Sequence, residues 1–395
     1  MDYLSGQSSQ GDQATLPAQV NSIQAERTQA GHIPSLDGIR GLAVFMVLIL
    51  HFDPQVGGPA ALSRAVSAVA HLGQLGVDIF FVLSGFLITG ILLRTKREKG
   101  YLKNFYMRRA LRIFPLYYGT LLVLLIANLI YVRESGIERL WWFATYLQNI
   151  PMTFRSGGLV GPAHFWSLAV EEHFYFVWPM LVYLVPRRQL PRVLMLIIVF
   201  AFVSRAILLY FGFGVYYFTP CRIDSLALGS LLAIMSEEKA MPSLRLVCGL
   251  ILAGIPLVIA SFLLVSGKSL VIVQMVRFPM IGVLCSMVLI LSQVWQPATA
   301  FFSTLLLRFF GKYSYALYVF HPFTVILFHR QALRGAVGFL IFLCLNCVLA
   351  LLSWHLWEKH FLRLKRRFES ARKSVIKRKV SPEPGLTAQV NEAVS

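Results

Sequence analysis

Ten apolar stretches, separated by short polar segments, follow one another from residue 38 to residue 357. A helix needs about 20 mostly apolar residues to cross a bilayer, and the stretches approach or reach that length. The predicted spans are 38–54, 73–93, 113–132, 164–185, 193–211, 222–236, 244–265, 270–292, 313–329 and 335–357. A shorter apolar segment, 140–150, predicts an interfacial or re-entrant element. The predicted fold class is therefore all-α, a polytopic transmembrane helical bundle of about ten spans.

Basic residues are distributed unevenly between the two sides of this bundle. An even number of spans places both termini on one side. With both termini inside, the inner segments hold 27 of the 37 Lys and Arg residues and the outer segments hold 8. Cytoplasmic segments of membrane proteins carry the excess of Lys and Arg. The charge pattern thus predicts that both termini are cytoplasmic.

Composition supports a membrane protein, with 57% hydrophobic and 14% charged residues and a mean hydropathy of +0.66. A net charge of +19 often indicates nucleic acid, but here the basic residues lie beside the spans. We therefore expect contact with anionic headgroups of the lipid bilayer and no nucleic-acid partner. The five cysteines show no spacing typical of a metal site or a disulfide framework, and we predict no metal.

The two ends of the chain differ from its apolar middle, which forms a transmembrane domain over residues 36–357. Residues 1–35 are polar and rich in Gln, Ser and Ala, and they predict a disordered cytoplasmic head. Residues 358–395 predict a basic cytoplasmic tail, disordered toward its end, because ten Lys and Arg residues lie between Lys359 and Lys379.

Arg40 and His51 are the first candidate site residues, since ionisable groups inside a span are costly and often functional. Ten uncharged residues separate them, so on one α-helix they share a face and lie roughly 16 Å apart along the axis. The pair suggests a charge-binding end and a proton-handling centre. The alternative is a helix-end arginine that reaches the interface and a histidine satisfied by a neighbouring helix.

Arg109 and Arg112 lie at the end of the most basic cytoplasmic segment, 94–112, which holds eight Lys and Arg residues. Three residues apart, they share a face of a helix. Paired guanidinium groups at the start of a helix, where we place these two, suit phosphate. The alternative is an ordinary positive-inside cluster.

Acidic residues inside the apolar segments form the next group of candidates. Glu171 shares a helical face with Tyr175, whereas Glu172 points about 100° away. A carboxylate at this depth needs a cation, a proton or hydrogen-bond donors, so we expect an Arg or His partner for Glu171. Asp78 lies just inside the second span, and Ser84 is interpreted as a helix-packing residue.

Two further pairs of residues in the predicted spans include ionisable side chains. Arg222 and Asp224 begin the span 222–236 and predict a structural ion pair at an outer helix end. His321 and Pro322 lie mid-span, where proline frees a backbone carbonyl that a neighbouring group has to satisfy.

Six segments in this order resemble the signatures of the acyltransferase 3 family of bacterial integral-membrane O-acyltransferases. They are LDGIRGLAVFMVLILHF (36–52), GVDIFFVLSGFLIT (76–89), RRALRIFPLYY (108–118), HFWSLAVEEHFYFVWP (164–179), CRIDSLALGSLLA (221–233) and YSYALYVFHP (313–322). Single motifs are loose, but six in order are specific, and the resemblance covers residues 36–357.

The resemblance implies a ten-helix enzyme of the bacterial inner membrane that takes an acyl group, usually acetyl, from cytoplasmic acyl-CoA to a hydroxyl group. The family's Arg-x10-His motif falls on Arg40 and His51, and its Arg-x-x-Arg motif falls on Arg109 and Arg112. Its carboxylate falls on Glu171. Some relatives add a further helix and an SGNH hydrolase-like domain. The short tail after residue 357 predicts neither here, so the membrane domain would complete the transfer or hand the group to another protein.

For acyl transfer, His51 is the predicted general base, because an imidazole can take up a proton near neutral pH. A carboxylate, Glu171 or Asp78, would orient it. The three arginines would hold the CoA phosphates. An acyl-His51 intermediate and direct transfer both fit.

The acceptor is left open among carbohydrate, lipid-linked glycan and secondary metabolite. A rival hypothesis is a transporter or flippase with an intramembrane proton relay. Consumption of acetyl-CoA would distinguish the two.

Overall fold

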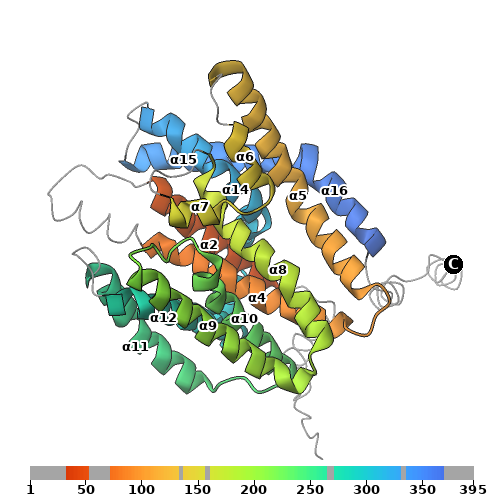
Figure 1. Ribbon diagram of the computed structural model, residues 1–395, viewed down its shortest axis with the longest axis vertical. Coiled ribbons are helices and arrows are strands. Elements are labelled where there is room, and N and C mark those ends of the chain that lie inside the picture. Colours follow the sequence, from red (N-terminus) through yellow and green to blue (C-terminus); the bar gives the residue numbers. More distant parts are fainter. Residues whose placement is uncertain are drawn as a thin grey trace, which may run out of the picture. The chain divides into compact units, whose positions relative to one another are not determined.

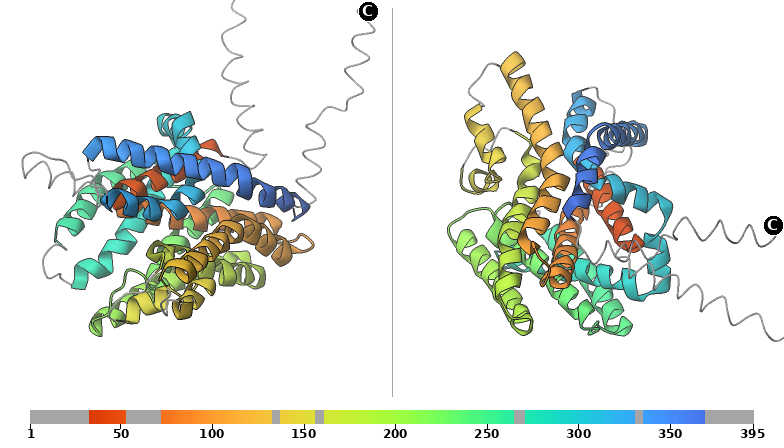
Figure 2. Two further views of the ribbon diagram at one scale, coloured as in Figure 1. Left: turned by 90° about the horizontal axis from the view of Figure 1, so that it is seen from above. Right: turned by 90° about the vertical axis from the view of Figure 1, so that its right-hand side faces the viewer.

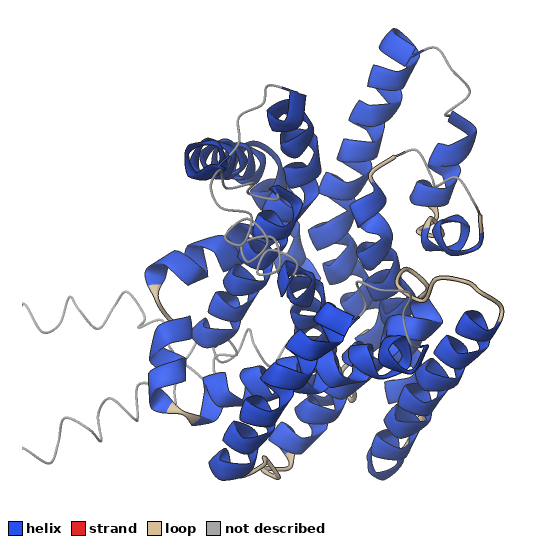
Figure 3. Ribbon diagram, turned by 90° about the vertical axis from the view of Figure 1, so that its left-hand side faces the viewer, coloured by secondary structure: helices blue, strands red, loops and turns tan. Residues whose placement is uncertain are grey.

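The computed structural model describes residues 33–52, 72–132, 137–155, 161–264, 271–330 and 335–368. Within these ranges the regular structure is helical, with no β-strand, as Figure 3 shows. The predicted all-α bundle is therefore confirmed. Residues 1–32 of the predicted head and 369–395 of the predicted tail lie outside the described ranges.

Each of the ten predicted spans coincides with one long helix. These helices are α2 (Pro34–Phe52), α4 (Leu75–Thr95), α5 (Tyr101–Ala127), α8 (Trp166–Leu184), α9 (Leu190–Tyr210), α10 (Thr219–Glu237), α11 (Leu244–Leu264), α12 (Val271–Val294), α14 (Leu305–Arg330) and α15 (Gly335–Ser353). The shorter helices are α6 (Ile137–Ala144), α7 (Asn149–Phe154), α13 (Gln296–Phe302) and α16 (Lys359–Leu364). The segment 140–150 thus falls on two short helices, α6 and α7.

Two long helices begin well before the apolar stretch that predicted them. α5 begins at Tyr101 rather than at residue 113, and α14 begins at Leu305 rather than at residue 313. The reason is that hydropathy locates the part of a helix suited to lipid, whereas backbone hydrogen bonding continues through basic residues of good helix propensity.

Seven of the described helical segments are long and apolar enough to cross a membrane, which agrees with a multi-pass membrane protein. The predicted spans outside these seven correspond to α8, α10 and α14. These three helices carry charged or imidazole side chains within their length, among them Glu171, Arg222 and His321. The count of ten spans and the side on which the termini lie stay predictions.

Helices α2 and α4 pass between two groups of helices in Figure 1, the green α9–α12 and the blue α14–α16, and Figure 2 shows these groups from two further directions. Close backbone contacts fix α2 and α4 in place. A Cβ atom added at Gly41 of α2 would lie 1.9 Å from the carbonyl oxygen of Leu307 in α14. One added at Gly85 of α4 would lie 2.0 Å from that of Leu226 in α10. Small residues therefore allow the close approach that helix packing in membranes favours.

Candidate functional site

A pocket of about 90 Å³ brings together four of the six predicted site residues: Arg40, Arg109, Arg112 and Glu171. These side chains come from three helices, α2, α5 and α8. The rest of the lining is Val77, Phe80, Phe81, Ser84, Ile113, Ser167, Leu168, Ser314, Tyr315 and Tyr318. Arg109 and Arg112 share one face of α5, as their spacing predicts. Their expected place at the start of a helix is wrong, because α5 already begins at Tyr101.

The three arginines give this pocket an excess of positive charge. The Arg40 guanidinium donates a hydrogen bond to Asp37 at 3.2 Å, and Arg109 lies over the ring of Tyr175, 3.9 Å from its centroid. The Nε atom of Arg109 is buried without a hydrogen-bond partner among the described residues. Guanidinium groups present planar pairs of donors that match phosphate and carboxylate. The lining therefore presents three guanidinium groups and one carboxylate, Glu171.

Glu171 is the carboxylate of this pocket. The hydroxyl of Ser84, on α4, donates a 2.6 Å hydrogen bond to Glu171 Oε1. Arg109 lies close enough to Glu171 to interact with it electrostatically, and the expected Arg or His partner of Glu171 stays a prediction. Sequence reasoning missed Ser84, which was interpreted as a packing residue. Its neighbour Gly85 makes the close helix contact, and Ser84 faces the pocket instead.

His51 lies at the other end of α2 from Arg40, outside the lining of the pocket. Its Nδ1 is 2.9 Å from the carbonyl oxygen of Val47. A carbonyl oxygen can only accept, so in the neutral ring the hydrogen is on Nδ1 and Nε2 carries the free lone pair. In this structure a backbone carbonyl, rather than a carboxylate, orients the ring. A general base needs such an unprotonated nitrogen, so this tautomer of His51 can accept a proton at Nε2.

Beside His51 lies a row of side chains that the spacing of the sequence did not predict. The ring of His321 is 4.7 Å from that of His51, and the ring of His164 is 5.3 Å from that of His321. The Tyr318 hydroxyl is 2.6 Å from both the His164 carbonyl oxygen and the Ser167 hydroxyl. Tyr318 and Ser167 also line the pocket, so this row reaches from the pocket wall to His51. No group of three or more His, Cys, Asp or Glu side chains in the described ranges is arranged to hold a metal ion.

Pro322 explains how His321 is held. A proline has no backbone N–H, so the carbonyl four residues earlier, that of Tyr318, loses its helical donor. The Nδ1 atom of His321 lies 2.7 Å from this carbonyl oxygen and replaces the missing donor. The predicted need for a neighbouring group is confirmed, and the histidine itself meets it.

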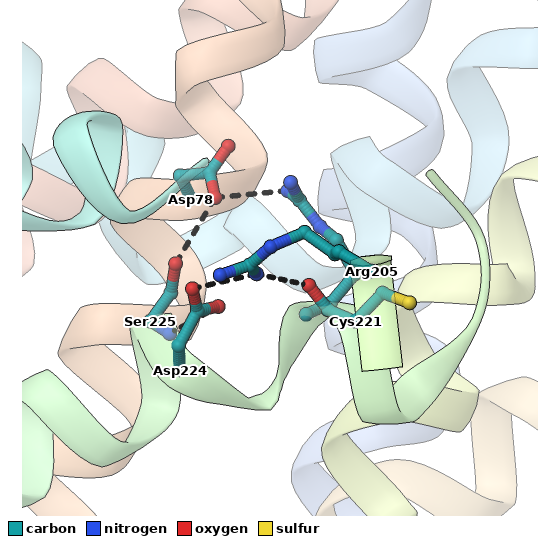
Figure 4. A network of polar contacts seen from close by, with 6 residues as sticks. Asp78, Arg205, Cys221, Asp224 and Ser225 are labelled. Atoms are coloured by element: carbon teal, nitrogen blue, oxygen red, sulfur yellow. Dashed lines mark hydrogen bonds and ion pairs between the residues drawn. The ribbon is translucent and has the colours of Figure 1, made fainter. Parts of the chain in front are cut away.

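Asp78 lies in a separate buried network, shown in Figure 4. Its carboxylate is 2.8 Å from the Arg222 guanidinium and also accepts a 3.2 Å hydrogen bond from Ser225. Asp224 pairs with Arg205 at 2.8 Å, and both side chains are fully buried. The predicted pair between Arg222 and Asp224 is therefore wrong. Residues two apart on a helix point in different directions, so each finds its partner on another helix.

The family of the chain follows from comparison with known proteins. The acyltransferase 3 family profile, described as an acyltransferase domain, matches residues 33–357. The chain therefore belongs to this family of acyltransferases. This class favours an enzyme over the rival transporter or flippase. No solved structure matches the chain.

The curated relatives that the chain resembles are named as O-acetyltransferases. The putative peptidoglycan O-acetyltransferase YrhL of Bacillus subtilis (strain 168) is 31% identical over 366 residues, which cover 83% of this chain and 54% of the relative. The O-acetyltransferase OatA of Staphylococcus aureus (strain NCTC 8325 / PS 47) is 26% identical over 360 residues, covering 83% and 57%. The peptidoglycan O-acetyltransferase OatA of Listeria monocytogenes serovar 1/2a (strain ATCC BAA-679 / EGD-e) is 37% identical over 163 residues, covering 38% and 24%. The chain spans about half the length of the first two relatives.

Proposed function

We propose that this protein is an O-acetyltransferase that moves an acetyl group from cytoplasmic acetyl-CoA to a hydroxyl group of a cell-envelope carbohydrate. The observation that carries the proposal is the convergence of Arg40, Arg109 and Arg112 on one pocket, with His51 on the same helix as Arg40. The family and the names of the relatives support acetyl transfer, and the relatives named for peptidoglycan make a glycan the preferred acceptor.

Charge and distance support acetyl-CoA as the donor. Acetyl-CoA carries phosphate groups, and the three guanidinium groups bind them at the cytoplasmic end of the bundle. On α2, Arg40 and His51 are eleven residues apart, or roughly 16 Å along the axis. Phosphates held at the arginines therefore leave the rest of the donor to extend toward Tyr318 and His51.

The acceptor hydroxyl reaches His51 from the outer half of the membrane. Nε2 of His51 removes the proton of the acceptor hydroxyl while the hydroxyl oxygen attacks the thioester carbonyl. The C–S bond breaks, and the leaving thiolate takes up a proton to give CoA. Glu171 offsets the charge of Arg109 and holds Ser84 at the pocket. Asp78 acts as a positioning residue, because its partner is Arg222 of α10.

Purified protein with radiolabelled acetyl-CoA and a glycan acceptor tests the proposal. The wild type transfers label to the acceptor, and His51→Ala reduces the rate by about 10²- to 10⁴-fold, the usual loss for a positioned acid–base group. His360, an exposed histidine on α16, provides the matched control, and His360→Ala keeps the wild-type rate. Near-normal turnover by correctly folded His51→Ala would contradict the role of His51. No consumption of acetyl-CoA by the wild type would contradict the donor.

The acceptor is identified by mass spectrometry of envelope glycans from a strain that lacks the gene. The proposal, which places the enzyme in the bacterial inner membrane, expects the deletion to remove O-acetyl groups from one glycan. Restoration of those groups by the wild-type gene, but not by the gene for His51→Ala, completes the test. O-acetylation that is unchanged in every envelope glycan would direct the search to secondary metabolites.

A further inference from the structure

His321 is a fully buried histidine with one unused ring nitrogen. Its side chain has no exposed surface, and its Nδ1 is 2.7 Å from the Tyr318 carbonyl oxygen. Because that oxygen can only accept, Nδ1 carries the hydrogen and Nε2 carries a lone pair. Nε2 has no hydrogen-bond partner among the described residues. A buried polar atom left unpaired costs free energy and needs an explanation.

The position of His321 between the proposed base and the pocket supplies that explanation. Its ring centroid is 4.7 Å from that of His51 and 5.5 Å from that of Tyr318, which lines the pocket. The third neighbour with a polar ring is His164, at 5.3 Å. His51 comes from α2, Tyr318 from α14 itself, and His164 from the 3₁₀ turn that precedes α8. His321 thus adjoins the base on one side and the pocket wall on the other.

We propose that His321 is the proton-relay group of the transferase, a role that rests on the proposed function. His51 takes the proton from the acceptor hydroxyl as the ester C–O bond forms and the thioester C–S bond breaks. Nε2 of His321 accepts that proton from His51 and gives it up to the leaving CoA thiolate, which forms between Tyr318 and His51 at the far end of the donor from its phosphates. The hydroxyl loses one proton and the thiol gains one, so the step needs no oxidant, reductant or further co-reactant.

If the role of His321 is purely structural, its only task is the hydrogen bond to the Tyr318 carbonyl. Two amide substitutions distinguish this structural role from the proton relay. In His321→Asn, the amide N–H can reach the Tyr318 carbonyl, as Nδ1 does, but no base stands at the place of Nε2. In His321→Gln, the amide lies near the place of Nε2 and the carbonyl loses its donor. A structural role predicts that Asn preserves activity and Gln does not. The relay predicts that both substitutions remove it.

The experiment measures kcat and KM for acetyl-CoA with the purified full-length chain and the acceptor used above. The relay predicts a loss of kcat of at least about 10²-fold in both variants, with KM within about twofold of the wild type, since the arginine pocket is unchanged. His360→Asn is the matched control on an exposed histidine and should keep both constants. Wild-type kcat in His321→Asn would overturn the relay.

A variant that fails to fold does not leave the proposal untested. Pro322→Ala restores a backbone N–H for the Tyr318 carbonyl, so His321→Asn combined with Pro322→Ala needs no side-chain donor there. The relay predicts that this double variant folds and stays slow, while Pro322→Ala alone is active. Full activity of the double variant would refute the relay. His51→Ala, assayed in parallel, separates the two proposals: an active His51→Ala contradicts the proposed function, whereas an inactive one beside an active His321→Asn contradicts only the relay.

Discussion

Replacing Asp78 by Ala should destabilise the protein without touching the pocket. Asp78 Oδ1 and Arg222 Nη2 are 2.8 Å apart, and the two side chains are 3% and 1% exposed. Unit charges at that separation attract by about 6 kcal/mol at an effective dielectric constant of 20, and desolvation opposes this gain. Removing one partner of a buried pair leaves the other charge uncompensated, which typically costs 3–5 kcal/mol. We expect the free energy of unfolding of Asp78→Ala to fall by about that amount.

A second substitution separates packing from chemistry. Arg222→Met removes the orphaned charge and keeps an unbranched apolar side chain over the ring of Phe278, which lies 4.1 Å from the guanidinium. Replacing both members of a buried pair with apolar residues is often neutral or stabilising. The double variant, Asp78→Ala combined with Arg222→Met, should therefore regain most of the stability lost in Asp78→Ala. Reversible unfolding in mixed detergent micelles, followed by tryptophan fluorescence, measures the free energy for the wild type, both single variants and the double variant.

Activity of the same four proteins decides the role of Asp78. If Asp78 acts only by pairing with Arg222, the double variant transfers acetyl groups at a rate near that of the wild type. A double variant that is as stable as the wild type but inactive would refute this reasoning. It would instead support the sequence-based prediction that Asp78 takes part directly in catalysis with His51.

Two more predictions concern the donor pocket and the topology. Replacing Arg112 by Ala should raise KM for acetyl-CoA about 10- to 100-fold, the equivalent of one charge-assisted hydrogen bond, and Lys should recover only part of the loss because it lacks the planar fork. Arg188→Ala, at an exposed arginine, is the control and should keep the KM of the wild type. An unchanged KM in Arg112→Ala would indicate that Arg112 belongs to an ordinary positive-inside cluster. With the exposed Cys344 changed to Ser, a Cys replacing Arg155 should react with an impermeant thiol reagent in intact spheroplasts, and a Cys replacing Lys99 should not. The reverse labelling would overturn the predicted orientation.

The sequence predicted the helices and much of the pocket because both depend on short-range spacing. Hydropathy located ten helices, and intervals of three, four and eleven residues fixed which side chains share a helical face. The face shared by Arg109 and Arg112, for example, needs no knowledge of other helices. The resemblance to a family then indicated that Arg40 and Glu171 belong to the same site.

Partners on different helices could not be predicted in this way. Arg222 finds Asp78, 144 residues earlier, because α4 and α10 pack through Gly85 and Gly229. The contact between His51 and His321 likewise depends on how α2 meets α14. One chain without that packing offers many combinations of buried polar residues, and a nearby pair such as Arg222 and Asp224 is an easy but incorrect choice.

The side from which the donor enters tests the central claim most directly. The arginine pocket and His51 lie toward opposite ends of α2, so the account needs donor and acceptor to approach from opposite faces of the membrane. The measurement uses proteoliposomes of known orientation, with radiolabelled acetyl-CoA on one face and the glycan acceptor on the other. Acetyl-CoA supplied only to the cytoplasmic face should label the acceptor, and acetyl-CoA supplied only to the outer face should not. Equal labelling from both faces, or labelling only from the outer face, would contradict the proposed path from the arginines to His51.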